Sequence, residues 1–457
     1  MSKRTMTGSD VFHMAIVAVP ILALAGTIGA ATVSWRSHQT RLEQAIRDVT
    51  ADGTTIDHST QLRRYDANSS KDATATWKAI LAATEDYNAV YGGPFAWEGD
   101  ESPYEQLVPP GQDWVAAEVI HQYAQGAEPI LQKIDSLLDS GDTIWTPLVA
   151  EAFEMNLNEV QKSRALARLL RYVFLDAVHQ GDSQRAIMTI RATDRFFGPS
   201  QQSFLMVGEL VQIACYSVTM AEVRRSIAAD VWTDEELAEI KSIIDKPSEW
   251  DRRWRSVVES ELYSYLPVLM DGKIGSSLSR QTAAPLPLGV APSSLISVVQ
   301  MQQELINLPV AQRYSEIDKA RQITEDHARK PDDASMDRLL QVPFTSSDWL
   351  TDLLTPAYGA LAGAFSRVAN EQRYTRTVLA TRQFERQFHR WPESLDELGR
   401  VGLPQSETQA FDGGPFAFEV DAQDQMTIYL QSNRNTDWSH VLGRDPEVIT
   451  LVPGAGD

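Results

Sequence analysis

One long segment without a charged side chain places the strongest constraint on the fold. Residues 11–33 contain no Asp, Glu, Lys or Arg. A helix rises about 1.5 Å per residue, so roughly 20 apolar residues cross the hydrocarbon core of a bilayer. We therefore expect residues 11–33 to form a single transmembrane anchor, preceded by a short cytoplasmic head at residues 1–10.

Two other interpretations of this segment stay open. Lys3 and Arg4 ahead of an apolar run are also typical of a secretory signal peptide, with Ala23-Leu24-Ala25 as a cleavage candidate. A buried core helix would usually be shorter. Basic residues lie on both sides of the segment, so the positive-inside rule alone does not decide the orientation. Because the head is short, we expect a cell inner membrane protein with the bulk of the chain extracytoplasmic.

The charge balance limits the partners of the remaining chain. The 457 residues carry a formal net charge of −21, and removing residues 1–33, with Lys3, Arg4 and Asp10, leaves −22. Proteins that bind nucleic-acid backbones present basic surfaces, so we expect no nucleic-acid partner. The same charge argues against electrostatic docking on anionic lipid. A hydrophobic fraction of 43% is typical of a globular chain, and the length allows roughly two to four domains.

Common site chemistries find little support in the residue pattern. The single cysteine, Cys215, excludes an intramolecular disulfide, and its apolar neighbours predict a buried, inert thiol. The eight histidines include no His-x-x-x-His pair, and His121 and His179 lie near apolar helix faces, where we expect structural roles. Nucleophile-elbow, Walker and dinucleotide-binding motifs are also missing.

Residues 34–370 have the periodicity of an antiparallel helical array. Gly181 predicts one helix end, and Thr233 with Glu236 predicts a capping box at a helix start. One wide apolar stripe is formed by Leu166, Leu169, Leu170, Val173, Phe174 and Ala177. Glycine, serine and proline at residues 271–292 predict a long surface loop. The expected helices cover about residues 72–91, 114–138, 184–197, 204–227, 248–266, 293–328 and 355–389, together with those ending at residue 181 and starting after residue 233.

Two of these helices carry finer expectations. In the helix at 114–138, the apolar residues Val115, Val119, Ile120 and Tyr123 mark the first half, and Gly126 with Pro129 should kink or split it. In the helix at 248–266, Trp250 and Trp254 stand among the arginines 252, 253 and 255. They could stack on an anionic or sugar ligand, but we expect them to pack one helix edge while the arginines pair with nearby acids.

The last part of the chain predicts a small α+β module. A short helix at residues 393–399 precedes two runs of alternating apolar residues, at 416–420 and 426–430, separated by a polar turn at 421–424. This pattern is typical of a β-hairpin, and residues 447–452 could add a third strand. A hairpin alone is marginal, so it should pack on the preceding helix.

Residues 382–398 (RQFERQFHRWPESLDEL), followed by Phe411-Asp412-Gly413, resemble the soluble end of type II secretion pseudopilins. Pro392, Leu395 and Leu398 fit the family's spacing of one proline and two leucines. The resemblance implies a pseudopilin-like module at residues 371–457. The chain is also similar to uncharacterised membrane-anchored bacterial proteins that end in this module. No prepilin cleavage site precedes the body, so assembly into a pilus is not implied.

The resemblance also draws attention to calcium, which pseudopilins often bind in a loop after the sheet. Asn433, Asn435 and Asp437 place three oxygen ligands at alternate positions, like the start of a calcium loop. Trp438 and Arg444 stand where such a loop needs a glycine and a bidentate glutamate. We therefore expect a solvated turn and no cofactor, with calcium as the alternative.

Together these patterns favour a mainly α protein with an N-terminal transmembrane helix, a helical body at 34–370 and an α+β module at 371–457. The expected role is interaction or scaffolding with a protein partner in the cell envelope, because helical arrays offer extended surfaces. No catalytic residue is assigned. The alternative is an envelope hydrolase whose site is assembled only by the fold, beneath the 271–292 loop.

Overall fold

A computed structural model describes residues 36–37, 39–48, 70–91, 103–142, 144, 158–199, 206–245, 250, 253–261, 292–306, 348–408, 416–430 and 448–453. None of the helices in these ranges is long and apolar enough to span a membrane. The expected anchor at 11–33 lies outside the described residues, as do the loop at 271–291 and the candidate calcium ligands Asn433, Asn435 and Asp437.

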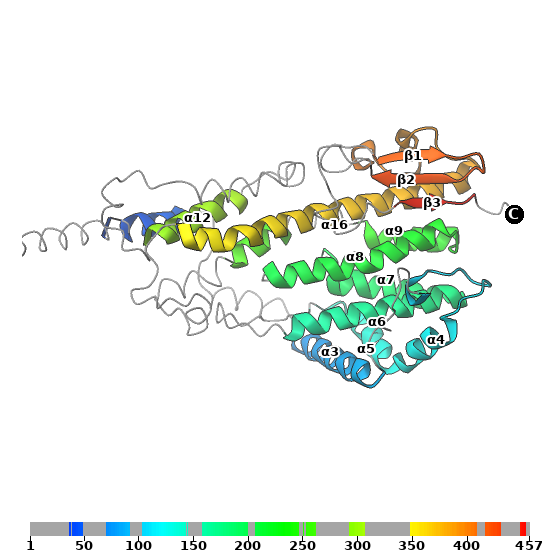
Figure 1. Cartoon of the computed structure of the whole chain (residues 1–457), viewed down its shortest axis with the longest axis horizontal. Helices are drawn as coiled ribbons and strands as arrows, with labels where there is room; N and C mark the ends of the chain where they lie inside the picture. The colour runs from blue at the N-terminus through cyan, green and yellow to red at the C-terminus, as the bar shows by residue number, and fades with distance from the viewer. Residues whose placement is uncertain are drawn as a thin grey trace, which may run out of the picture.

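The chain is mainly helical and ends in a small antiparallel sheet of three strands (Figure 1). Residues 253–261 are helical as well. The helices and strands with printed bounds are α3 (Lys71–Tyr91), η1 (Pro103–Glu105), α4 (Ala117–Gly126), α5 (Glu128–Ser140), α6 (Asn158–Gln180), α7 (Ser183–Phe197), α8 (Met206–Ala228), α9 (Asp234–Ile244), α12 (Pro292–Ile306), α16 (Asp348–Phe388), η2 (Leu395–Val401), η3 (Gln405–Glu407), β1 (Phe416–Val420), β2 (Met426–Leu430) and β3 (Ile449–Leu451).

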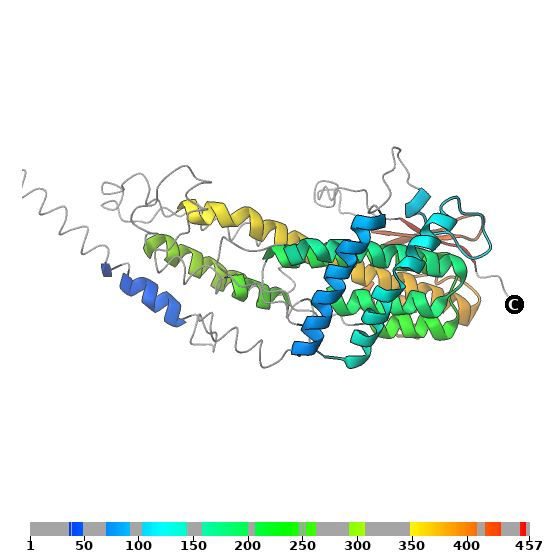
Figure 2. The ribbon, with the colours of Figure 1, turned by 90° about the horizontal axis from the view of Figure 1, so that it is seen from below.

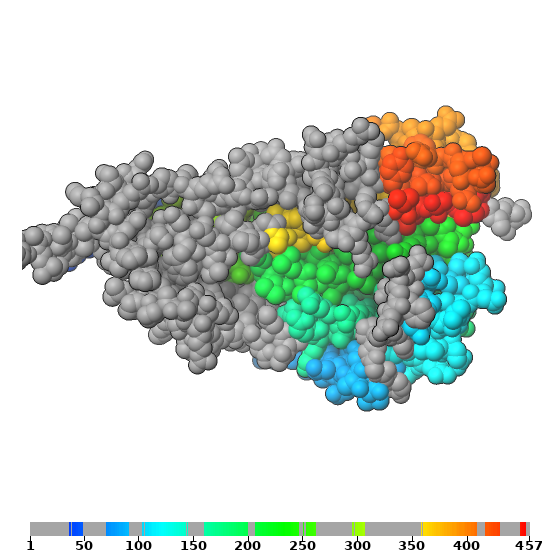
Figure 3. Space-filling model, viewed as in Figure 1, coloured from blue at the N-terminus to red at the C-terminus, as the bar shows by residue number. Residues whose placement is uncertain are grey.

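The elements stack in layers. The sheet lies beside α16, and β3 also contacts α8 (Figure 1). α16 lies on α8, α8 packs on α6 and α7, α3 and α4 pack on α6, and α5 packs on α3 and α7. α3 crosses α6 steeply in the second view (Figure 2). Residues 103–142, in cyan, reach the surface at the same end as the orange and red sheet (Figure 3). One continuous apolar core runs from Ala73 to Leu451 through all these layers.

Most of the helix expectations are confirmed. The stripe from Leu166 to Ala177 is buried in α6, and Gly181 follows the helix with a left-handed φ of 70°. The capping box is present, since Thr233 N donates to Glu236 Oε2 at 2.8 Å and Glu236 N donates to Thr233 Oγ1 at 3.3 Å. The expected helix at 114–138 is split into α4 and α5 between Gly126 and Glu128.

Three details were wrong. α4 begins at Ala117 rather than at Trp114, and it turns Ile120, Tyr123 and Ala124 inward while Val115 and Val119 are 94% and 42% exposed. α16 begins at Asp348 and contains Pro356, so its packing on α8 and α12 offsets the roughly 3 kcal/mol cost of an internal proline. The short helix after Trp391 is 3-10 and spans Leu395–Val401.

The predicted hairpin and third strand are confirmed. β2 pairs with β1 and β3, with Phe418 opposite Ile428 and Met426 opposite Leu451. The Asp421 carboxylate holds the turn by accepting the backbone N–H groups of Gln423 and Gln425 at 2.9 and 2.8 Å. The buried face packs on α16, where the Tyr374 hydroxyl donates to Ile428 O at 2.5 Å. The expected boundary at 370/371 lies inside α16, which runs across it unbroken.

Candidate functional site

The two histidines singled out from the sequence both have internal partners. His121 Nδ1 lies 3.0 Å from Asp176 Oδ1, and Asp176 is buried while His121 is half-buried. Gln125 Nε2 lies 2.8 Å from the other ring nitrogen, Nε2. His179 Nδ1 lies 3.3 Å from Val108 O, and its ring meets that of Trp114 edge-on. In many catalytic sites a carboxylate orients a histidine whose other ring nitrogen activates a hydroxyl or thiol. Here the other ring nitrogen of His121 faces the Gln125 side-chain amide.

The tryptophan pair is a packing element, as expected. Trp250 and Trp254 are each 1% exposed, and both rings meet Phe365 of α16 edge-on. Arg253 lies over the Trp250 ring and forms an ion pair with Glu209, and both charged side chains are buried. Its guanidinium also donates to Phe197 O at 3.4 Å and to Gly198 O. The expected pairing of the arginines with acids is confirmed for Arg253, and for Arg255, which donates to Glu259 at 2.8 Å.

Three buried groups along α8 have strongly shifted pKa values. Cys215 is buried, as expected, and burial raises the pKa of its thiol to about 12. Burial also raises the pKa of Glu209 to about 7, although Arg253 opposes the shift. Glu261 accepts the backbone N–H of Met206 at the first residue of α8, at 3.0 Å, and burial raises its pKa to about 7.

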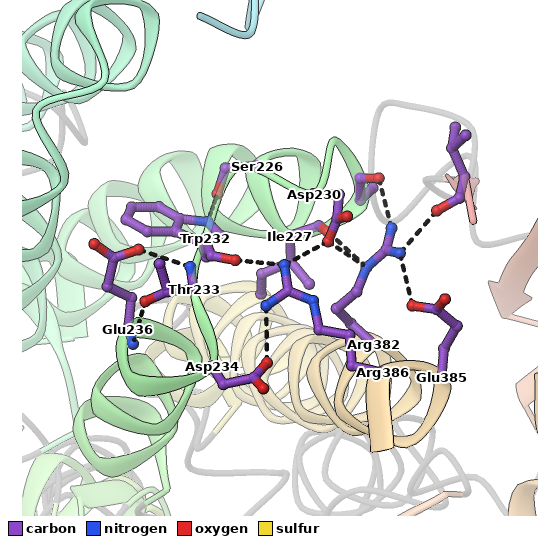
Figure 4. Close-up of polar contacts among 12 residues, drawn as sticks. Ser226, Ile227, Asp230, Trp232, Thr233, Asp234, Glu236, Arg382, Glu385 and Arg386 are labelled. Carbon is purple, nitrogen blue, oxygen red and sulfur yellow. Dashed lines mark hydrogen bonds and ion pairs between the residues drawn. The ribbon is translucent and has the colours of Figure 1, made fainter. Parts of the chain in front are cut away.

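The densest polar constellation of the described residues joins the C-terminal half of α16 to the α8–α9 connection (Figure 4). Arg382 is fully buried, and its guanidinium donates to Ile227 O at 3.4 Å and Ala228 O at 3.0 Å. These are last-turn carbonyls of α8, which have no partner within their own helix. The positive guanidinium also faces the negative end of the α8 dipole.

Arg382 reaches the sheet as well. Its Nη1 donates to Val452 O, directly after β3, at 2.7 Å, and to Glu385 Oε2 at 3.2 Å. Its guanidinium lies over the Trp391 ring, 5.6 Å from the ring centre. One side chain therefore connects α8, α16 and the end of β3.

Asp230 links this arginine to a second one. Its φ of 57° is left-handed, a conformation that Asp tolerates better than most residues, and it terminates α8. Its Oδ1 lies 3.3 Å from Arg382 Nε and 2.7 Å from Arg386 Nη2. Arg386 also donates to Asp234 Oδ1 at 2.8 Å and to the carbonyl of Trp232 (Figure 4). We call Asp230, Arg382 and Arg386 the arginine clamp.

Sequence reasoning missed the arginine clamp and the pairs Glu209–Arg253 and His121–Asp176. Asp230 and Arg382 are 152 positions apart in the sequence, and the other two pairs are separated by 44 and 55 positions, so no local spacing joins the partners. The one available signal was the run of arginines along the last helix, since a helix with so many basic residues needs acids facing it.

Among the described residues, no group of three or more His, Cys, Asp or Glu side chains gathers that could hold a metal ion. The arrangement of the clamp suits holding elements together, because it joins α16 to the end of α8 and to the residue after β3. In comparisons with known proteins, no family model, no curated protein and no solved structure matches the chain.

Proposed function

We propose that the chain is a single-pass cell inner membrane protein whose extracytoplasmic body serves as an interaction or scaffold module in the envelope. Residues 11–33 are the anchor and residues 1–10 the cytoplasmic head. Residues 371–457 form a pseudopilin-like module at the far end of the body. The proposal assigns no cofactor, no nucleic-acid partner and no catalytic residue to the chain.

The observation that carries this proposal is the placement of the two ends of the body. The helical residues 39–48, which follow the anchor segment, lie beside α12 at one end of the elongated molecule in both views, and the sheet lies at the other (Figures 1 and 2). α16 extends over much of this length, and its 41 residues measure roughly 60 Å. An anchor at 11–33 would therefore leave the sheet far from the bilayer.

A scaffold must keep its parts in fixed relative positions, and the contacts of the sheet support this role. The arginine clamp, the Tyr374 hydroxyl and the shared core fix the sheet to α16 and α8. A flexibly linked module would move independently of the body, whereas this one shares its hydrophobic core. The body and the sheet would then present a single surface to a partner.

No second function is proposed. Among the described residues the hydrolase alternative has no supporting observation, because His121, the base paired with Asp176, has Gln125 at its Nε2. The loop beneath which the site was expected lies outside these residues.

Thiol labelling tests the topology, because the only native cysteine is buried and gives a low background. Gln132→Cys places a thiol on the exposed side of α5, and Ser2→Cys places one in the head. A membrane-impermeant maleimide should label the Gln132→Cys protein in spheroplasts and the Ser2→Cys protein only after lysis. The unsubstituted protein should stay unlabelled in both conditions. Labelling of Gln132→Cys only after lysis would contradict the proposal.

A further inference from the structure

The outward face of α4 carries an apolar pair where a soluble helix normally has polar residues. Val115, in the turn before the helix, is 94% exposed, and Val119, one turn later, is 42% exposed. The other exposed positions of α4 are Glu118, Gln122 and Gln125. α4 and the turn before it therefore expose two valines beside these polar positions.

The backbone below Val115 is held in place. Ala117 N donates to Trp114 O at 3.0 Å and closes the turn that presents Val115. Trp114 is buried, its indole N–H donates to Pro103 O at 2.7 Å, and its ring meets His179 edge-on. A surface fixed in this way loses little conformational entropy when a partner binds.

The chain segment that carries this face is acidic in its sequence. Residues 103–142 contain seven Asp or Glu, one Lys and no Arg. Asp113 and Glu118, which flank Val115, are both exposed, and the exposed acids of α5 and its end include Asp135, Asp139 and Asp142. An apolar centre with a carboxylate rim complements a partner with an apolar stripe between basic side chains.

α4 lies at the same end of the molecule as the sheet (Figure 1). On the proposed topology this end is far from the bilayer, where a partner can reach it. A second copy of the chain would bring the same acids against each other, and an anionic membrane would repel them.

We propose that the outward face of α4, centred on Val115 and Val119, binds a basic amphipathic helix of a partner protein. The apolar stripe of that helix covers the two valines, and its lysines or arginines face Asp113 and Glu118. This inference rests on the interaction role proposed above and names the chemistry of the partner.

A designed probe peptide tests the inference with the full-length chain in neutral detergent. The probe is a fluorescent Leu/Lys helix of about five turns with leucines at helical spacing, and the control probe is a scrambled peptide of the same composition. We expect the helical probe to bind, with an affinity that falls as salt rises. Val115→Ser with Val119→Ser should weaken binding at least about tenfold, and Val218→Ser, at an exposed valine of α8, should change it less than about twofold.

The charges are tested separately with Asp113→Asn and Glu118→Gln, which should weaken binding and reduce its salt dependence. Equal binding of the scrambled probe, an undiminished affinity of the double valine variant, or no binding by the unsubstituted chain would each overturn the inference. Those results leave the thiol-labelling test of topology untouched, so failure here is distinguishable from failure of the proposed function.

Discussion

Replacing Arg382 by methionine should destabilise the chain far more than the same change at Arg386, one helical turn later. Arg382 is fully buried, whereas Arg386 is 22% exposed, and both arginines contact Asp230. Methionine is a comparable apolar chain that fills the space without the charge. The two substitutions therefore lie on the same helix, make the same chemical change and remove a contact with the same partner, Asp230. The two arginines differ in their burial and in the contact that Arg382 makes with the sheet.

The magnitude follows from what each change leaves behind. Arg382→Met removes the donor to Ile227 O, Ala228 O and Val452 O, and it leaves the half-buried Asp230 and Glu385 with less compensation. Removing one partner of a buried pair costs about 3–5 kcal/mol, and the residual contact of Asp230 with Arg386 places this variant near the lower value. Arg386→Met breaks contacts that are partly solvated, so we expect about 1 kcal/mol.

Guanidinium denaturation of the full-length chain in mild detergent, followed by tryptophan fluorescence, measures both free energies of unfolding. Hydrogen exchange adds a local test, since the amides of β3 should lose protection in Arg382→Met and keep it in Arg386→Met. Equal costs for the two variants, or unchanged protection of β3 in Arg382→Met, would refute the view that Arg382 holds the sheet to the helices.

Further predictions concern single side chains. Burial raises the pKa of Glu261 to about 7, so its contribution to stability is complete below about pH 4.5 and is lost as the pH rises through 7. Glu261→Gln should therefore flatten the pH dependence of the unfolding free energy by up to about 3 kcal/mol. An unchanged profile would disprove this assignment. Cys215 should react with a thiol reagent only at the rate of unfolding, and fast modification under native conditions would argue against its burial. Thr233→Ala removes one half of the capping box and should cost about 1 kcal/mol in thermal unfolding, whereas no loss would mean that the cap is energetically neutral. Calcium should leave the melting temperature unchanged, and a rise that Asn435→Ala and Asp437→Ala abolish would restore the calcium alternative.

Local patterns in the sequence predicted the elements well. The apolar stripe of α6, the capping box before α9 and the alternation of β1 and β2 each depend on residues within one or two turns of each other. Short-range patterns of this kind directly predict helix faces, helix starts and strands. The third strand followed in the same way, and the turn between β1 and β2 was located correctly by its polar residues.

Long-range polar contacts could not be predicted in the same way. Nothing near Asp230 indicates that it faces Arg382, because that contact depends on how α16 crosses the end of α8. Glu209 likewise lies in an ordinary apolar helical segment, and only its ion pair with the distant Arg253 explains a buried acid at this position. The start of α4 at Ala117 was also missed, because its N-cap residue, Ala116, has no side-chain cap that would mark a helix start in the sequence.

Protease protection with N-terminal sequencing tests the membrane-anchored, exported arrangement most directly. The full-length chain carries an epitope tag after Asp457 and is treated with protease in intact cells and in spheroplasts. We expect the tag to be cut only once the outer barrier is opened, and the recovered protein to retain residues 1–33. A tag that stays protected in spheroplasts would place the body in the cytoplasm and contradict the proposed orientation.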